Sequence, residues 1–343
     1  MLEHGGRLRL AARHYEIPLD EWLDLSTGIN PESYPVAPID PSCWQRLPED
    51  DDGLDAAAAA HYGNDRLLVL PGSQAAIQAL PALFDVSDAA CVAPLYEEHP
   101  HAWERAGHAL RRLPTLADAL ASGAPNVFLC NPNNPTATTH SRVELIAAAK
   151  QLRLRDGWLI VDEAFADAEP EHSVTTLAGS DAAPNLIVLR SLGKFYGLAG
   201  ARVGFLFGDS GKLGRLREMI GPWAVANPSR AAARQALTDT AWQKTTRAKL
   251  AARSRRLADL LSPLGKIGRT ALFCTVSTPY VAEQATHFAR CAILTRRFEP
   301  HGLLRFGLPG SEVEWARLSV AVAEWVPPDA QRLAPVKQHF QAA

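Results

Sequence analysis

The sequence predicts an α/β fold, with a large unit built on a mostly parallel sheet flanked by helices and a smaller α+β unit after it. Short, almost wholly apolar runs recur through residues 67–207 and indicate buried strands. Helix-like stretches separate several of these runs, as crossover helices do in a parallel sheet. After Pro222 the rhythm changes to a long Ala- and Arg-rich stretch and short strand-like pieces.

The expected strands are apolar runs that end in turn or polar residues. They lie at residues 67–70, 90–93, 127–130, 159–161, 186–189 and 203–207. Helices are expected at residues 73–84 and 141–154. Ser141 followed three residues later by Glu144 is typical of a capping box, which marks the start of the second helix.

The remaining parts of the chain are assigned by their position around this core. Residues 228–261 form the long Ala- and Arg-rich stretch, and residues 271–277 and 303–307 are strand-like. The first 40 residues have too little regular pattern for a domain, so we expect them to pack on the smaller unit or across the functional site. The predicted division is a segment 1–40, a large cofactor-binding domain 41–225 and a small domain 226–343.

Composition and charge exclude several classes of protein. The 343 residues are 47% hydrophobic and 21% charged, which is ordinary globular composition. With 35 Lys and Arg against 37 Asp and Glu, the net charge of −2 creates no positive field for nucleic acid or anionic lipid. The five cysteines include no C-x-x-C pair, and no apolar run of about 18 residues occurs. We therefore expect a cytoplasmic protein without a membrane or nucleic-acid partner.

Polar residues follow the expected strands at their carboxyl ends, where open α/β sheets bind ligands. Gly72, Ser73 and Gln74 follow the strand at 67–70. A glycine turn that enters a helix presents backbone N–H groups to an anion such as a phosphate. The same wording also serves as an ordinary strand-to-helix connection, so the neighbouring strands must decide.

Three further strands end in residues that complete one chemical set. Asn134 follows 127–130, Asp162 follows 159–161, and both Ser191 and Lys194 follow 186–189. A pyridoxal phosphate site requires such a set. The lysine joins the cofactor's aldehyde, the carboxylate keeps the pyridine nitrogen protonated, and the amide bonds the ring oxygen. The sequence thus predicts pyridoxal 5'-phosphate as the cofactor.

The order and wording of these segments resemble the fold-type I, aspartate aminotransferase-like superfamily over nearly the whole chain. Within it, the likeness is strongest to the threonine-phosphate decarboxylases of cobalamin biosynthesis. The resemblance implies that Lys194 in S-x-x-K forms the internal aldimine and that Asp162 pairs with the pyridine nitrogen. It assigns the cofactor shell as Gly72, Ser73, Gln74, Tyr96, Asn134, Ser191 and Arg202, with Tyr96 stacked on the ring. Tyr62 would reach the neighbouring subunit's cofactor phosphate in a homodimer.

Each of these positions also has an ordinary structural explanation. Asp162 is placed to cap the following segment, an isolated Tyr96 is more often core, and Arg202 is placed to pair with a surface carboxylate. Only the whole set, in order, favours the cofactor site. One position departs from the superfamily pattern, since many relatives have Tyr where this chain has Phe165. Without that hydroxyl, we expect the imine of the bound cofactor to have a raised pKa.

Substrate contacts are expected near both ends of the chain. Histidinol-phosphate aminotransferases have arginines in similarly worded segments, which implies Arg296 for a substrate phosphate and Arg305 for a carboxylate. One of the adjacent pair Arg296 and Arg297 must point elsewhere, because successive strand residues face opposite ways. At the amino terminus, His4, Gly5 and Gly6, together with Gly28 and Asn30, resemble segments of the decarboxylases. Paired glycines let backbone N–H groups approach an oxyanion.

These inferences predict an enzyme that decarboxylates L-threonine O-3-phosphate to (R)-1-amino-2-propanol O-2-phosphate. A histidinol-phosphate-type aminotransferase is the alternative, since it shares the cofactor shell, and a non-catalytic pyridoxal-phosphate-binding protein is a third possibility. A metal site is not expected. Glu97, Glu98, His99 and His101 cluster in the sequence, but they are adjacent rather than spaced along one helix face, and Pro100 breaks the register.

Overall fold

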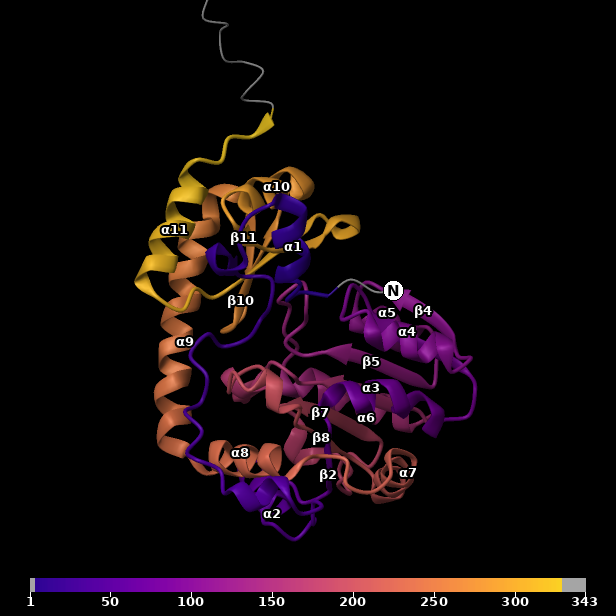
Figure 1. Cartoon of the computed structure of the whole chain (residues 1–343). Helices are drawn as coiled ribbons and strands as arrows, with labels where there is room; N and C mark the ends of the chain where they lie inside the picture. Colours follow the sequence, from indigo (N-terminus) through magenta and orange to yellow (C-terminus); the bar gives the residue numbers. More distant parts are fainter. Residues whose placement is uncertain (1–3, 329–343) are drawn as a thin grey trace, which may run out of the picture.

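The computed structural model describes residues 4–328 of the chain. Its largest sheet has seven strands in the order β2-β8-β7-β6-β5-β3-β4 (Figure 1). The strands are β2 (Leu67–Leu70), β3 (Asp88–Val92), β4 (Ala109–Leu113), β5 (Asn126–Cys130), β6 (Trp158–Asp162), β7 (Leu186–Ser191) and β8 (Gly204–Phe207). Strands β3 to β7 pair in parallel, and β8 runs antiparallel to both β2 and β7. The predicted mostly parallel α/β sheet is confirmed.

Helices cover both faces of this sheet. They are α2 (Leu54–Tyr62), α3 (Ser73–Ala79), α4 (Glu98–Arg105), α5 (Leu116–Ala121), α6 (Arg142–Arg153), α7 (Ser210–Ile220) and α8 (Asn227–Thr238). Alternate residues of β5 enter separate apolar cores: Val127 lies in the core with α6, and Phe128 in the core with α3, α4 and α7. Both cores draw on the same strand because its side chains alternate between the faces. The predicted capping box of Ser141 and Glu144 is confirmed.

A second sheet, of four antiparallel strands in the order β12-β13-β10-β9, forms the smaller unit. Its elements are α9 (Thr240–Leu261), β9 (Lys266–Arg269), β10 (Phe273–Ser277), α10 (Val281–Arg290), β11 (Ile293–Leu294), β12 (Arg296–Phe298), β13 (Leu303–Gly307) and α11 (Glu312–Ala323). The long helix α9 runs along one side of the molecule, from α8 beside the large sheet to the small sheet (Figure 1).

The amino-terminal segment lies against this smaller unit. Its helix α1 (Leu8–Tyr15) is close to α10 (Figure 1), and β1 (Leu23–Asp24) pairs in parallel with β11. The chain then passes the end of the large sheet on its way to α2, which places residues 26–31 between the two units. The boundaries at 40 and 225 stay a prediction.

One strand of the large sheet was not predicted from the sequence. Strand β4 was missed because it lies at the sheet edge and carries Arg111 and Arg112 toward solvent, so it lacks an apolar run. The Ala- and Arg-rich stretch 228–261 forms two helices, α8 and α9. They separate at Asp239, whose side chain accepts a hydrogen bond from the backbone N–H of Trp242 and so begins the second helix.

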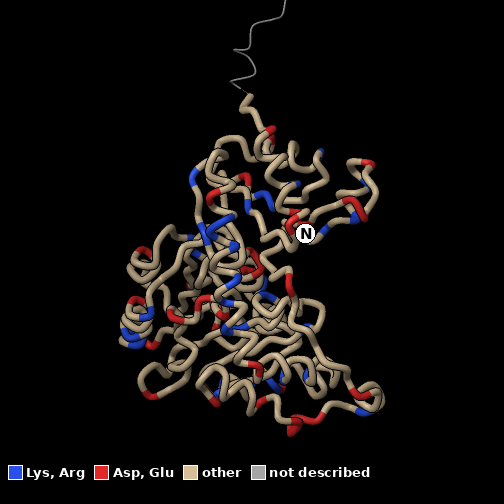
Figure 2. The backbone as a smooth tube through the Cα atoms, turned by 90° about the vertical axis from the view of Figure 1, so that its left-hand side faces the viewer, with Lys and Arg blue, Asp and Glu red and all other residues tan. Residues whose placement is uncertain are grey.

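Charge is distributed without large regions of one sign. Lys and Arg alternate with Asp and Glu along the backbone in the view of Figure 2. Among residues 4–328, no helix combines the length and the apolar character needed to cross a membrane.

Candidate active site

A cavity of about 300 Å³ lies at the carboxyl ends of β5, β6 and β7. It brings together most of the residues expected at the cofactor. Its lining includes His4, Gly5, Ser73, Gln74, Tyr96, Asn134, Asp162, Ser191, Lys194, Arg202 and Arg305. The residues of the large unit meet here because its parallel strands all end at the same edge of the sheet. Arg305 of the small unit and His4 and Gly5 of the amino-terminal segment complete the lining.

Lys194 lies in the turn that follows β7. Its Nζ is 5.4 Å from the centre of the Phe165 ring, and its backbone carbonyl accepts a hydrogen bond from the N–H of Asn30 at 3.0 Å. Burial, together with the charge of the neighbouring Arg305, lowers the pKa of the Lys194 amine to about 8. A larger share of the amine is therefore neutral near physiological pH, which is the form that attacks an aldehyde.

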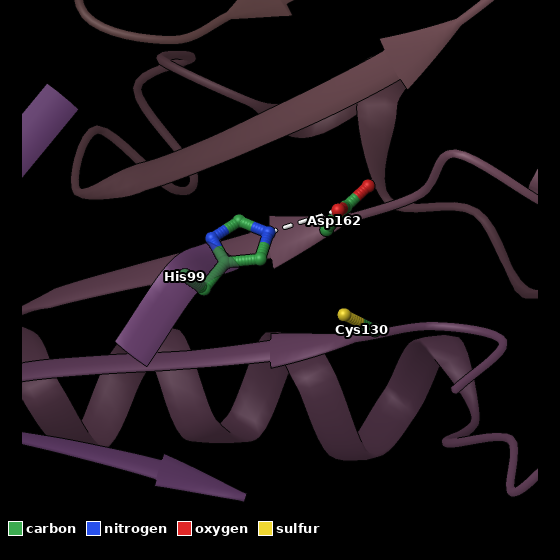
Figure 3. Close-up of side chains that lie close together, drawn as sticks. All are labelled: His99, Cys130 and Asp162. Atoms are coloured by element: carbon green, nitrogen blue, oxygen red, sulfur yellow. Dashed lines mark hydrogen bonds and ion pairs between the residues drawn. The ribbon is translucent and has the colours of Figure 1, made fainter. Parts of the chain in front are cut away.

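Asp162 ends β6 and is only 5% exposed. One carboxylate oxygen, Oδ2, lies 2.9 Å from Nε2 of His99 (Figure 3). The other accepts a hydrogen bond from the backbone N–H of Ala164 at 2.9 Å. Both contacts orient the carboxylate. A carboxylate fixed in this way is suited to pair with a protonated ring nitrogen of a ligand in the cavity.

Cys130 completes a buried group with His99 and Asp162, whose donor atoms lie within 4.8 Å of one another (Figure 3). Burial, with the Asp162 charge beside it, raises the pKa of the Cys130 thiol well above its usual range, so the sulfur stays protonated. We interpret the group as the polar floor of the cavity. The four residues 97, 98, 99 and 101 do not assemble: Glu97 pairs with Arg112 at the surface, and His99 turns inward.

The other end of the cavity is built for an anion. Gly72 precedes α3 with a φ of +79°, and a Cβ there would lie 2.8 Å from Nη2 of Arg202, so only glycine allows this close approach. Arg202 itself has a left-handed backbone, with a φ of +52°. Its guanidinium, the hydroxyls of Ser73 and Ser191 and the start of α3 provide donors of the kind that hold a phosphate.

Tyr96 and Gln74 line the same cavity and are linked. The Tyr96 hydroxyl donates to Oε1 of Gln74 at 3.3 Å, while Nε2 of Gln74 donates to Glu98 at 2.8 Å. Burial raises the pKa of Tyr96 to about 12, so its phenol remains neutral. A neutral aromatic ring on the wall of the cavity is suited to stack on a planar ligand.

Arg305 is a buried cation on β13, 6% exposed. It donates to Oδ1 of Asn134 and, at 2.7 Å, to the carbonyl of Ser26, whereas its Nε has no partner among the described residues. Burial and the neighbouring Arg296 lower the pKa of Arg305 to about 9. Both its open donor and its unfavourable burial predict an anionic ligand, such as a carboxylate, at this guanidinium.

The amino-terminal glycines fit closely around Ser26. The N–H of Gly6 donates to the Ser26 hydroxyl at 2.7 Å, and a Cβ on Gly5 would lie 2.4 Å from the Ser26 carbonyl oxygen. Arg296 lies opposite Arg305 in the register of β12 and β13. With His4 it lines two cavities that adjoin the cavity of Lys194.

Gly28 and Asn30 are expected site residues that do not line the cavity of Lys194. Gly28 packs against Phe165, where a Cβ would lie 2.8 Å from the ring. Asn30 is buried and donates from Nδ2 to the carbonyl of Phe195 at 2.9 Å, so it supports the lysine turn rather than facing a substrate.

The expectation for Tyr62 is wrong. Its ring is 6% exposed and packs inside the chain's own core, against Phe205 and Phe207 and 4.7 Å from the Arg190 guanidinium. A hydroxyl enclosed there cannot extend to a second subunit. The sequence pattern placed a tyrosine near the end of a helix but could not show which way the ring turns.

Sequence reasoning missed a buried ion network directly beneath the cavity. Arg190 donates to Glu163 at 2.7 Å and is paired with Asp167, and all three side chains are at most 3% exposed. Glu163 follows Asp162, and Arg190 precedes Ser191, so the network fixes two site residues through the backbone. The sequence did contain a signal for this network, since the charged residues Glu163 and Arg190 lie at the ends of two apolar strands.

These residues fit pyridoxal phosphate. Three features suit a planar ring with a phosphate at one end and an amino acid beside it. The Nε of Arg305 has no partner within residues 4–328, Gly72 closely approaches Arg202, and Lys194 shares one cavity with the fixed carboxylate of Asp162. Lys194, Asp162, Asn134 and Tyr96 would hold the ring, and Ser73, Ser191 and Arg202 would hold its phosphate. The effect of Phe165 on the bound cofactor stays a prediction.

The fold and this site define a class of protein. Residues 48–321 match the family described as aminotransferase class I and II, and the chain belongs to this family. Solved structures share the fold. A histidinol-phosphate aminotransferase from Sinorhizobium meliloti, determined in complex with pyridoxal-5'-phosphate, aligns with a TM-score of 0.77 and 20% identity over 94% of this chain and 98% of that chain.

Within the family, curated relatives narrow the resemblance. A threonine-phosphate decarboxylase of Pseudomonas aeruginosa is 47% identical over 94% of this chain and 97% of its own length. A threonine-phosphate decarboxylase of Sinorhizobium sp is 38% identical over 93% of this chain and 97% of its own length. The structure of L-threonine-O-3-phosphate decarboxylase from Porphyromonas gingivalis aligns with a TM-score of 0.72 and 20% identity, covering 87% of this chain and 98% of that chain. The likeness expected from the motifs is confirmed.

Proposed function

We propose that this chain is a pyridoxal-phosphate-dependent decarboxylase. It converts L-threonine O-3-phosphate to (R)-1-amino-2-propanol O-2-phosphate and carbon dioxide, a step of cobalamin biosynthesis. The observation that carries the proposal is a single cavity that holds Lys194, Asp162 and the incompletely partnered Arg305. The threonine-phosphate decarboxylases that share 47% and 38% of its residues support the choice of substrate.

In the reaction, the bond between Cα and the carboxyl carbon breaks, carbon dioxide leaves, and a proton takes its place on Cα. When bound, the cofactor supplies the electron sink that accepts the bonding pair. Arg305 binds the carboxylate and orients the bond that breaks. Asp162, held by His99, keeps the ring nitrogen protonated, and Lys194, whose pKa is about 8, delivers the proton to Cα.

The substrate phosphate is assigned to the opening of the cavity. His4, Gly5 and Gly6 bring a ring nitrogen and backbone N–H groups to this side, and Arg296 adds a guanidinium. Phosphate favours such a set of donors because each hydrogen bond is strengthened by charge. Arg296 is preferred to Arg297 for this role, since Arg297 lines the same two cavities but is half-exposed and pairs with Glu299 at 3.1 Å.

The enzyme is further proposed to work as a cytoplasmic homodimer. Trp44, Leu47 and Trp223 are 75%, 61% and 59% exposed. They lie on adjoining segments, since the Asn227 side chain donates to the carbonyl of Arg46 at 2.9 Å. Large apolar side chains exposed together favour an interface with a second copy. The five cysteines are free in the structure, as expected in a reducing compartment.

A histidinol-phosphate-type aminotransferase is the second candidate. It is favoured by the solved histidinol-phosphate aminotransferases, which share the fold with TM-scores up to 0.78, and by curated ones that are 33–39% identical over shorter stretches. Such an enzyme would return the proton to the cofactor instead of Cα and would need a second, keto-acid substrate.

Product analysis separates the candidates. Purified protein incubated with L-threonine O-3-phosphate alone is expected to release carbon dioxide and 1-amino-2-propanol phosphate in equal amounts. A keto product that forms only when 2-oxoglutarate is supplied would instead identify an aminotransferase. Turnover that persists at the wild-type rate in Lys194→Ala would exclude both candidates, and absence of any turnover would favour a binding protein.

A further inference from the structure

We infer that Glu98 is a positioning residue that holds His4 in place to bind the substrate phosphate, an inference that rests on the proposed function. Glu98 is the first residue of α4 and belongs to no motif of the cofactor shell. Its Oε1 lies 2.8 Å from Nε2 of His4. Its side chain is 13% exposed, so the pair is partly shielded from solvent and salt.

The second carboxylate oxygen of Glu98 is fixed by two amides. Nε2 of Gln74 and Nε2 of Gln78 each donate to Oε2 at 2.8 Å. Both glutamines lie on α3, whose first turn carries the expected cofactor-phosphate residues. Glu98 is therefore rigidly attached to the large unit, whereas His4 belongs to the amino-terminal segment that packs on the small unit.

The geometry assigns opposite roles to the two nitrogens of the His4 ring. Nε2 must carry a proton to donate to the Glu98 carboxylate, which leaves Nδ1 for a second partner. A doubly protonated ring donates from both nitrogens, so its Nδ1–H can bind an anion while Nε2 stays on Glu98. His4 lines all three adjoining cavities around Arg296 and Arg305, so an anion held by these arginines lies within its surroundings.

Phosphate recognition and the cofactor shell thus share one carboxylate. A ligand that has a phosphate uses His4, Glu98 and Gln74 as one connected set, whereas threonine without a phosphate leaves His4 unused. Glu98 therefore contributes to the preference for phosphorylated amino acids without contact with the reacting atoms.

The test is a double-mutant cycle on the holoenzyme with Glu98→Gln, His4→Asn and the double variant. Calorimetry measures the Kd of inorganic phosphate, and steady-state kinetics measure KM and kcat for L-threonine O-3-phosphate. Glu98→Gln is expected to raise both the Kd and the KM about tenfold, the usual effect of one charge-assisted hydrogen bond, with kcat and the cofactor's absorption band unchanged. In the His4→Asn background the same substitution should have no further effect.

Glu104→Gln is the matched control. Glu104 lies on the same helix and pairs with the half-exposed Arg112 at 3.0 Å, away from His4, so neither constant should change. A wild-type Kd and KM in Glu98→Gln, or effects of Glu98→Gln and His4→Asn that multiply, would overturn the inference. Loss of the cofactor's absorption band in Glu98→Gln would also overturn the inference, because it would show that Glu98 acts by holding Gln74 at the cofactor rather than by holding His4. Glu98-dependent phosphate binding in a protein that releases no carbon dioxide would refute only the proposed decarboxylation.

Discussion

The cavity encloses ionisable side chains of both signs. Lys194 and Arg305 are cations whose burial lowers their pKa values, while Asp162 is a carboxylate enclosed beside them. Such groups are costly for folding and are retained where a ligand uses them. The cofactor and substrate proposed for this site supply the missing partners: an aldehyde for the amine, a carboxylate for the guanidinium and a protonated ring nitrogen for the aspartate.

Asp162→Asn should lower kcat at least about 100-fold, because a neutral amide cannot hold the ring nitrogen protonated and the electron sink weakens. The protein should still bind the cofactor through Lys194 and the phosphate-binding residues. Decarboxylation rates and cofactor content measure the two effects separately. Asp118→Asn, at an exposed position on α5, is the control and should keep full activity. A rate within a factor of two of wild type in Asp162→Asn would contradict the assigned role.

Lys194 predicts a specific pH dependence of stability for the cofactor-free protein. The amine has a pKa of about 8 when folded and 10.5 when exposed, so between these values the unfolded chain holds more protons than the folded one. Stability from this group is therefore low below pH 8 and rises toward pH 10.5, by about 3 kcal/mol in total. Urea unfolding measures the free energy of unfolding of the wild type and of Lys194→Met. The wild-type value minus the Lys194→Met value should rise by about 3 kcal/mol across this window. A constant difference would show that the amine is not perturbed.

At the scale of elements, the strand ends that carry Asp162 and Ser191 are fixed from below. The buried Arg190 on β7 pairs with Glu163 and Asp167, which follow β6. From the opposite side, Asn30 bonds to the lysine turn through both its backbone and its side chain. The strands thus place their terminal side chains in the lining of one cavity, as a site for precise chemistry requires.

Arg190→Met should destabilise the fold by roughly 3–5 kcal/mol, because two buried carboxylates lose their counter-ion. Chemical denaturation measures this loss. Arg256→Met is the matched control, since Arg256 and Glu312 form an exposed pair whose removal should leave the denaturation midpoint nearly unchanged. Equal shifts in the two variants would mean that the buried network does not support the strand ends.

The elements also show where sequence reasoning succeeds. The strands of the cavity could be located because strands buried on both faces of a sheet are continuous apolar runs. The polar residues that follow each run then marked the ends of these strands. Side-chain direction is not encoded in that pattern. Tyr62 and Asn30 were assigned to ligands but face the protein interior, and the pairing of Glu98 with His4 joins residues 94 positions apart.

At the scale of the whole molecule, the cavity draws its lining from the large sheet, the small sheet and the amino-terminal segment. The apolar side chains left exposed near α8 support the proposed homodimer.

Trp223→Glu should weaken association and shift the particle mass, measured by light scattering, from a dimer toward a monomer, because a charge in an apolar interface is costly to bury. Val143→Glu provides the control, since Val143 is also exposed, at 77%, but lies on α6. A wild-type protein that is monomeric at micromolar concentration would contradict the homodimer.

The central claim is that the Lys194 amine is covalently joined to pyridoxal phosphate. Borohydride reduction of the holoenzyme followed by peptide mapping tests this claim directly, since reduction makes the bond permanent. One modified residue is expected, at position 194, carrying the mass of the reduced cofactor. Modification of a different lysine, or of none in protein that retains the cofactor's colour, would contradict it.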